Sequence, residues 1–309
     1  MTESSGNAWR AMDLSVRRRV DSIVSGEYEG MRLGVGSERE ELSRYQPGDD
    51  VRSIDWNITA RAGEPHVWRP RADNRLDTQV MVDMTPSMAF GTVADEKSEL
   101  AARIVAAVGL LTDAPGNTVG LQTFGPDGIR WYRPLRARLA ASRAPQTLSR
   151  AASRTGAGSP TLAQALTALG ARRGGPGLRV VVSDFLDPGG ANEAPFDWQT
   201  PLRRLAARHD VVAVEILDPR ELELPDVGAV VLVDPESGRQ RQVWTSDERL
   251  RRRYRDAAAE HRNAVAAAIS ASGADHLRAS TAGDWIRDLA KFLRERQRTL
   301  RRGRGPVRR

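Results

Sequence analysis

The stretch Thr78-Gln79-Val80-Met81-Val82-Asp83-Met84-Thr85-Pro86-Ser87 (residues 78–87) decides the fold. Its first seven residues form a short apolar run, with an aspartate in the sixth position, that leads into a turn with a proline. A continuous apolar run of this length is typical of a strand buried on both faces, as in a parallel sheet. Two hydroxyl residues, Thr85 and Ser87, follow Asp83. The stretch therefore predicts a buried strand that carries several side-chain oxygens just past its carboxyl end.

Strand and helix patterns alternate after this strand. We predict helices over 95–112, 138–153, 161–172 and 200–208, and strands over 119–124, 128–134, 178–183 and 210–217. Alternation with continuous apolar strands predicts an α/β, Rossmann-like fold with a mostly parallel sheet and helices on both faces. A hairpin follows, with strands at 228–234 and 240–245, then a helix over 247–272 capped by Ser246, a strand at 276–280 and a helix from about 283 to 299.

The ends of the chain differ from this middle. An amphipathic helix is predicted at 13–25, inside an N-terminal segment of residues 1–25. Residues 26–77 form an irregular, β-rich extension with strand-like pieces at 50–56 and 66–69. Residues 78–293 form the main domain. The last segment, 294–309, holds eight Arg and one Glu, which accounts for the whole net charge of +7 and predicts a basic, disordered tail.

Composition excludes several classes of function. The chain has no cysteine, which rules out disulfides, thiolate metal sites and a cysteine nucleophile. No apolar run approaches the ~20 residues of a membrane span, and the N-terminus lacks the pattern of a signal peptide, so we expect a cytoplasmic protein. No GxxxxGK[ST] motif is present, and the four histidines are scattered. Nucleotide binding and histidine-based catalysis are therefore disfavoured.

Oxygen-bearing side chains recur where strands end and helices begin. Asp83, Thr85 and Ser87 follow one strand, Thr161 opens a helix, and Asp184 directly follows the apolar strand 178–183. Ligands of open α/β sheets bind beyond the carboxyl ends of the strands. Carboxylate and hydroxyl oxygens suit Mg²⁺ or Mn²⁺ and suit Zn²⁺ poorly. The alternative for residues 83–87 alone is a plain Asx or Ser/Thr turn that closes the strand.

This pattern resembles the metal ion-dependent adhesion site of von Willebrand factor A domains. The usual motif has Ser at its second position, where this chain has Thr85. The resemblance implies that the hydroxyls of Thr85, Ser87 and Thr161 bind the ion directly. It also implies that Asp83 and Asp184 act directly or through water, and that an acidic side chain of a protein partner completes the coordination.

A closer resemblance covers residues 15–293. The segment 30–61 (GMRLGVGSEREELSRYQPGDDVRSIDWNITAR), the tripeptide at 183–185 and the turn at 234–238 are similar to number fifty-eight of the bacterial domain-of-unknown-function families, which is von Willebrand factor A-like. The residues at 39–42 depart from its usual pattern. This resemblance implies an adaptor or substrate-recruiting partner of a MoxR-type AAA+ ATPase in protein assembly or regulation.

Two other functions remain open at this point, although we expect no enzyme. A Mg²⁺-dependent phosphoryl transferase would use Asp83, but such enzymes carry a second aspartate as acid or base where this chain has Thr85. Nucleic-acid binding through the Arg-rich tail would depend steeply on salt. The sequence favours a metal-dependent module that binds a protein.

Overall fold

The computed structural model describes residues 40–45, 51, 54–70, 76–91, 96–151, 159–172, 174–186, 193–233 and 239–303. Its centre is a six-stranded sheet in the order β10-β7-β6-β3-β4-β5. Neighbouring strands are parallel except at one edge, where β5 runs antiparallel to β4. These strands are β3 (Asp77–Asp83), β4 (Thr118–Gly125), β5 (Gly128–Arg136), β6 (Leu178–Ser183), β7 (Asp210–Leu217) and β10 (Asp275–Ser280). The predicted α/β class with a mostly parallel sheet is confirmed.

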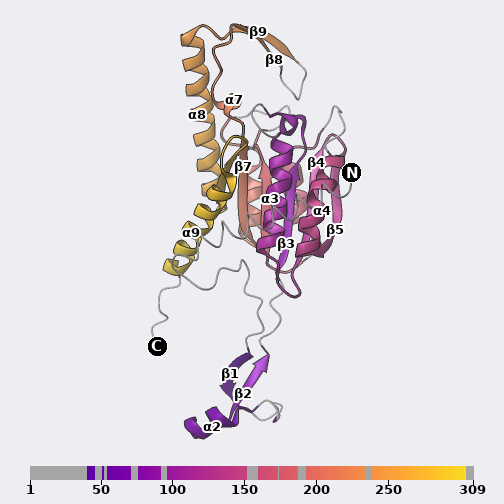
Figure 1. Cartoon of the computed structure of the whole chain (residues 1–309), viewed down its shortest axis with the longest axis vertical. Helices are drawn as coiled ribbons and strands as arrows, with labels where there is room; N and C mark the ends of the chain where they lie inside the picture. Colours follow the sequence, from indigo (N-terminus) through magenta and orange to yellow (C-terminus); the bar gives the residue numbers. More distant parts are fainter. Residues whose placement is uncertain are drawn as a thin grey trace.

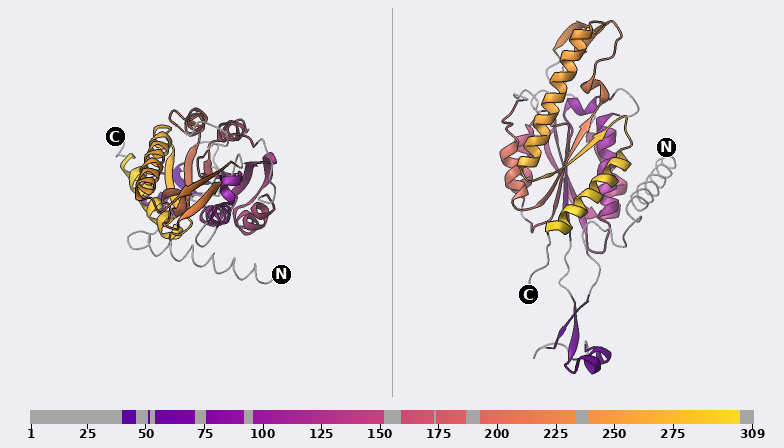
Figure 2. Two further views of the ribbon diagram at one scale, coloured as in Figure 1. Left: turned by 90° about the horizontal axis from the view of Figure 1, so that it is seen from above. Right: turned by 90° about the vertical axis from the view of Figure 1, so that its left-hand side faces the viewer.

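Helices cover both faces of the sheet (Figure 2). One face carries α3 (Lys97–Leu111), α4 (Ala137–Ala151) and α9 (Trp285–Gly303), and the other carries α5 (Leu162–Gly170), α6 (Gln199–Ala206) and α8 (Glu248–Ala271). Side chains alternate along each strand, so Val80 and Val82 join the first core while Met81 joins the second. Burial on both faces explains why these strands are continuously apolar.

The order in which the chain adds strands to the sheet reverses between β3 and β6. From β3 the chain builds β4 and β5 on one side, and then returns to place β6, β7 and β10 on the other. Such a switch point is where open α/β sheets bind ligands. Asp83 and Ser183 are the last residues of these two strands. The next residue, Met84, is held by its amide, which donates to the Phe124 carbonyl at 2.8 Å.

Gly125 permits this close approach of the site loop to β4. A Cβ at position 125 would lie 2.6 Å from the carbonyl oxygen of Met84. A side chain there would have to displace the backbone just after Asp83. The short 3-10 helix η2 (Pro86–Ala89) then carries the loop away from the sheet, with Thr85 at its N-terminus.

The N-terminal extension forms a small unit of its own. Strand β1 (Glu40–Arg44) pairs antiparallel with β2 (His66–Pro70), and α2 (Trp56–Ala62) lies between them in sequence. Figure 1 shows this unit at the end of the molecule opposite the β8–β9 hairpin. A strand in the 66–69 region is confirmed. Within the strand expected at 50–56, Ile54 forms an isolated antiparallel bridge with Val67, but the Asp55 side chain accepts from the amides of Asn57 and Ile58 and starts a helix at Trp56. The helix predicted at 13–25 lies outside the described residues.

The C-terminal part follows the predicted order of elements. Strands β8 (Ala229–Val233) and β9 (Gln240–Trp244) form the expected hairpin, whose turn at 234–238 lies outside the described residues. It stands above the carboxyl edge of the sheet, beside the first turns of α8 (Figure 1), and α7 (Pro219–Leu222) follows β7 at the same edge. The N-cap of α8 is Asp247, one residue after the expected Ser246.

Helix α9 confirms the helix expected from about 283 to 299 and extends to Gly303, within the segment 294–309 that we expected to be a disordered tail. Buried apolar residues up to Leu293 anchor the helix, and Arg296 forms ion pairs with Asp210 and Asp275 at the amino ends of two strands. These contacts continue the helix to Gly303, and residues 304–309 lie outside the described part. Within the described residues, no helix is long and apolar enough to cross a membrane.

Candidate metal-binding site at the carboxyl edge of the sheet

Asp83 is the centre of a buried group of oxygens. Its Oδ1 accepts from the amide of Thr85 at 2.9 Å and from the Thr85 hydroxyl at 2.6 Å. The Thr85 and Ser87 hydroxyl oxygens are 3.1 Å apart. All three residues are almost fully buried, with Asp83 0%, Thr85 2% and Ser87 3% exposed. The turn after β3 thus gathers one carboxylate and two hydroxyls, as the sequence pattern predicted.

The end of β6 supplies the second part of the site. Ser183 donates its hydroxyl to Asp83 Oδ2 at 2.6 Å and accepts from the amide of Phe185 at 2.9 Å. Asp184, between them, is also 0% exposed. Phe185 has a φ of 56°, which is rare and strained for a bulky residue. This left-handed turn is held by burial of the Phe185 ring against Trp198, and it fixes the backbone of Asp184 beside Asp83.

A lysine that our sequence analysis did not place in the site neutralises Asp184. The Lys97 ammonium donates to Asp184 Oδ2 at 2.7 Å and to Glu221 Oε1 at 2.5 Å. Its side chain is 0% exposed. Burial lowers the pKa of Lys97, but the negative charges of Asp184 and Glu221 outweigh that effect and raise the pKa above its ordinary value. The lysine therefore stays charged at neutral pH.

Asp83 carries no such partner. No ion pair joins its carboxylate to a basic side chain in the part of the chain that the structure describes. Burial, and then the negative charge of Asp184, raise the pKa of Asp83 to about 7, while the hydrogen bonds from Ser183 and Thr85 act in the opposite direction. A cation bound close to Asp83 would therefore stabilise the ionised form of its carboxyl group.

Thr161 stands apart from this cluster. Its hydroxyl accepts from the Gln164 amide at 3.2 Å, and the Gln164 side chain accepts from the Thr161 amide at 3.0 Å, which is a complete capping box for α5. The Gln122 side chain donates to the Ala165 carbonyl and holds this end of α5 beside the carboxyl half of β4. Thr161 therefore lies toward the same edge of the sheet, without a described hydrogen bond to Asp83, Thr85 or Ser87.

The donor set fits a hard dication. No group of three or more His, Cys, Asp and Glu that could hold a metal occurs within the described ranges, so an ion here would depend on hydroxyl oxygens as well as carboxylates. Thr85, Ser87 and the carboxylate of Asp83 already converge, and the described contacts of Asp83 include no compensating positive charge. Oxygen donors of this kind suit Mg²⁺ or Mn²⁺. Coordination by the five expected residues stays a prediction.

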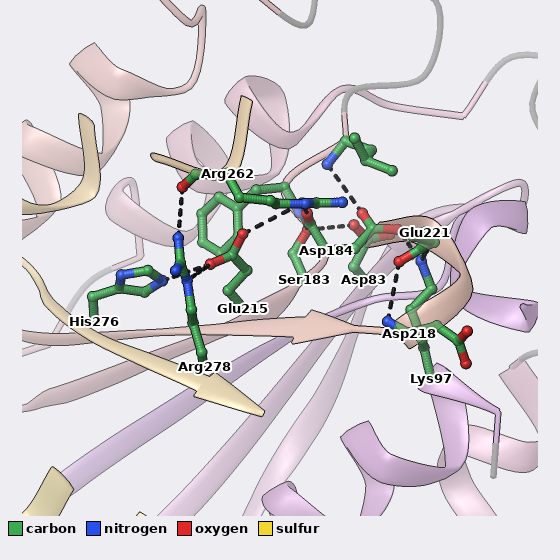
Figure 3. Close-up of polar contacts among 12 residues, drawn as sticks. Asp83, Lys97, Ser183, Asp184, Glu215, Asp218, Glu221, Arg262, His276 and Arg278 are labelled. Atoms are coloured by element: carbon green, nitrogen blue, oxygen red, sulfur yellow. Dashed lines mark hydrogen bonds and ion pairs between the residues drawn. The ribbon is translucent and has the colours of Figure 1, made fainter. Parts of the chain in front are cut away.

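A second buried charged group lies beside the site (Figure 3). The Glu215 carboxylate, 0% exposed, accepts from Arg278 Nε at 2.8 Å, contacts His276 Nε2 at 2.9 Å and lies 3.4 Å from Arg262 Nη1. Burial raises the pKa of Glu215, but the His276 hydrogen bond and the two arginine charges lower it below its ordinary value. Arg262 also donates to the backbone carbonyl of Asp184 at 2.7 Å. It thereby links α8 to the site.

Lys97, Ser183, Glu221 and Arg262 are the site residues that the sequence analysis missed. One signal pointed to Lys97. The chain has 47 basic residues, of which only Lys97 and Lys291 are lysines. A compact ammonium at position 97, in a chain that otherwise uses arginine, indicates a buried point charge. Glu221 and Arg262 gave no comparable signal, because they lie in charged stretches typical of solvent-exposed helices.

Several curated proteins are similar to this chain. An uncharacterized protein of Mycobacterium tuberculosis H37Rv is 39% identical over 291 residues, which is 94% of this chain and 89% of that protein. A shorter uncharacterized protein of Mycobacterium avium is 45% identical over 143 residues, or 46% of this chain and 80% of that protein. The first relative extends the similarity over nearly the whole chain.

Solved structures with a similar arrangement have low sequence identity. BatB from Bacteroides thetaiotaomicron is 13% identical, with a TM-score of 0.44 over 72% of this chain and 99% of that chain. The VWA domain of SpRpn10 is 13% identical, with a TM-score of 0.35 over 70% of this chain and 93% of that one. The family model described as "Protein of unknown function DUF58" matches residues 41–264. With this match and the mycobacterial relatives, the chain belongs to the DUF58 family.

Proposed function

We propose that this protein is a protein-binding module that uses a divalent cation at Asp83 to bind an acidic side chain of its partner. The single observation that carries the proposal is the buried Asp83 carboxylate, which lies among the hydroxyls of Thr85 and Ser87 at the switch point of the sheet. Burial, and then the negative charge of Asp184, raise its pKa to about 7, and no basic side chain among its described contacts stabilises the ionised form. A cation from solution would stabilise that form.

The residues that would hold the ion are Asp83, Thr85 and Ser87, with Asp184 and Thr161 at its periphery. Bound Mg²⁺ or Mn²⁺ would supply a Lewis-acidic position that attracts a carboxylate from another protein. The chain's own residues would orient the donors. Ser183 holds the second oxygen of Asp83, and Arg262 fixes the Asp184 backbone. Binding of this kind is directional and is reversed by chelation.

The partner class that family resemblance supports is a MoxR-type AAA+ ATPase. In that arrangement this chain would be the adaptor that brings client proteins to the ATPase during assembly or regulation. The β8–β9 hairpin and α7 flank the same edge of the sheet as Asp83, so a protein bound there has surface on both sides of the site (Figure 1). A large partner is therefore compatible with this edge.

The metal is tested first, because it can be measured without the partner. We expect isothermal titration of the chelator-treated protein with Mn²⁺ to show one site that Asp83→Ala abolishes and that Thr85→Val and Ser87→Ala weaken. Asp256→Ala is the matched control, since Asp256 is an exposed carboxylate on α8 away from the site. Equal Mn²⁺ binding by Asp83→Ala and wild type would contradict the proposal.

Partner binding is tested second, by affinity capture with a purified MoxR-type ATPase from the same organism. We expect capture in Mg²⁺ to be lost in EDTA and lost in Asp83→Ala, with Asp256→Ala unaffected. Circular dichroism of Asp83→Ala should match the wild type, because β3 keeps its pairing with β4 and β6 and Met84 keeps its hydrogen bond to the Phe124 carbonyl. Capture that persists in EDTA would show that the ion has no role in binding.

A further inference from the structure

Both oxygens of the Asp184 carboxylate already have partners. Oδ1 accepts from the amide of Leu186 at 3.0 Å, and Oδ2 accepts from the Lys97 ammonium at 2.7 Å. A metal ion that coordinated Asp184 would therefore share the carboxylate with these two donors, and one of them, the ammonium, carries a positive charge that the ion would repel. The amide is fixed in the turn after β6, whereas the lysine has a flexible four-carbon chain. The lysine is the partner that can leave.

Lys97 is held in a place that disfavours a positive charge. It is the first residue of α3, and the N-terminus of a helix carries partial positive charge. Its side chain is fully buried, which adds a desolvation cost. Asp184 and Glu221, which follow β6 and β7, offset both costs. The buried ammonium thus depends on two carboxylates, and the loss of either one would leave it with a single counter-charge.

We propose that the Lys97 ammonium and a divalent cation compete for Asp184, so that metal binding expels Lys97 from between Asp184 and Glu221. The ammonium is the site's resident cation in the metal-free protein. A dication within a few ångströms of it would be repelled strongly in this buried environment. Lys97 therefore sets how tightly the site binds metal. This inference rests on the metal-dependent part of the proposed function.

Expulsion of Lys97 would also change the contacts of α7. Glu221 Oε2 accepts from the Asp218 amide at 3.2 Å and completes the capping box of α7, while Oε1 contacts only Lys97 among its described hydrogen bonds. The Lys97–Glu221 ion pair thus ties α7 to α3 across the carboxyl edge of the sheet. Its loss would remove this link, while the described contacts of this region with β10 and α8, from Thr281 to Asp218 and from Arg255 to Glu223, would remain.

The chain offers an internal control for a direct test. Lys97 and Lys291 are its only lysines, and Lys291 is exposed on α9. Reductive dimethylation followed by mass spectrometry should label Lys291 rapidly with or without metal. We expect Lys97 to be protected in EDTA and to react at least about tenfold faster at saturating Mn²⁺. The increase should follow the same Mn²⁺ concentration dependence as binding, and Asp83→Ala should abolish it.

Charge variants test the same competition by affinity. Lys97→Met removes the ammonium and keeps the length of the chain, and we expect it to bind Mn²⁺ at least about tenfold more tightly than wild type. Lys97→Arg keeps the charge and should not gain affinity, and Lys291→Met is the matched control. Because Lys97→Met leaves two buried carboxylates unpaired, its melting temperature should fall in EDTA. Mn²⁺ should then raise that temperature by more than it does in wild type.

The outcomes separate this inference from the proposed function. Mn²⁺ binding by Lys97→Met but not by wild type supports the competition and overturns metal dependence in the native protein. Mn²⁺ binding by wild type with Lys97 as protected as in EDTA, or no gain in Lys97→Met, overturns the competition and leaves the proposed function standing. Absence of binding in both proteins overturns both ideas.

Discussion

Two buried charged groups lie side by side at this edge of the sheet, and they differ in their balance of charge. Around Glu215, two arginines and a histidine surround a single carboxylate. Around Asp83, three carboxylates share one lysine, because Lys97 serves Asp184 and Glu221 and none of its described contacts reach Asp83. The pKa values record the contrast, since that of Glu215 is lowered and that of Asp83 is raised to about 7.

The contrast distinguishes a structural cluster from the site that we propose binds a cation. A buried carboxylate whose donors are all supplied by the chain stabilises only the folded protein, and Glu215 joins β7 to β10 and α8 in this way. A buried carboxylate that lacks positive charge destabilises the fold slightly and leaves binding energy for an external cation. Arg262 belongs to both groups, since its guanidinium contacts Glu215 and the backbone of Asp184.

The largest expected effect comes from breaking the balanced group. Glu215→Gln would leave Arg262 and Arg278 facing a neutral amide in a buried place, and we expect it to lower the free energy of unfolding by ~3–5 kcal/mol. Urea denaturation at pH 7 measures this. Because the pKa of Glu215 is lowered on folding, its contribution is present at neutral pH and is lost as pH falls below the ordinary range of a glutamate.

Glu248→Gln is the matched control for that experiment. Glu248 lies on α8 with its side chain 82% exposed, 3.9 Å from Arg252. A surface pair of this kind contributes less than ~0.5 kcal/mol. If Glu215→Gln lowered the free energy of unfolding no more than Glu248→Gln does, the charged group around Glu215 would not stabilise the fold, and its contrast with Asp83 would fail.

The fold could be predicted from the sequence because local patterns determine it. The central strands β3, β6 and β7 are largely apolar and buried, and the helices between them have buried faces, so the order of elements along the chain follows from the spacing of apolar residues. The strand-like piece expected at 50–56 does not reach its expected end, because the capping of α2 by Asp55 starts a helix at Trp56. The end of α9 was misjudged because ion pairs of Arg296 with distant aspartates cannot be read from a run of arginines.

The site could be predicted only in part for a related reason. Asp83, Thr85 and Ser87 are close in sequence, so one turn brings them together. The contacts of Lys97 depend on how α3, β6 and α7 pack, and the residues involved are separated by 87 and 124 positions. A pattern of residue types does not say which residues will pair, and only the three-dimensional arrangement shows that the Lys97 ammonium donates to Asp184 Oδ2.

A smaller effect should follow from neutralising Asp83. A carboxyl with a raised pKa binds more protons when folded than when unfolded, so its contribution to stability falls as pH rises from about 4 to about 7. Asp83→Asn mimics the protonated form and escapes this loss. In EDTA we expect Asp83→Asn to be more stable relative to wild type at pH 8 than at pH 5, by ~1–2 kcal/mol.

The quantity to compare is the stability of Asp83→Asn relative to wild type at pH 8 minus the same quantity at pH 5. The introduced side-chain amide also alters the hydrogen bond to Ser183, but this effect is equal at both pH values and cancels. Asp256→Asn, at an exposed carboxylate, should show no such difference. With saturating Mn²⁺ the advantage of Asp83→Asn at pH 8 should reverse, since only the aspartate can hold the ion. A pH-independent difference would mean that Asp83 is ionised in the folded protein throughout this range.

The smallest effect concerns Thr161, whose hydroxyl serves the fold and is expected to serve the ion. A hydroxyl oxygen has two lone pairs, of which the Gln164 amide takes one. Thr161→Ala should lower the free energy of unfolding by ~1 kcal/mol through the lost cap. It should also weaken Mn²⁺ binding severalfold, whereas Thr161→Ser should match wild type in both measurements. A loss of stability with unchanged Mn²⁺ affinity would make Thr161 a cap alone, and the ion would then depend on the donors that follow β3 and β6.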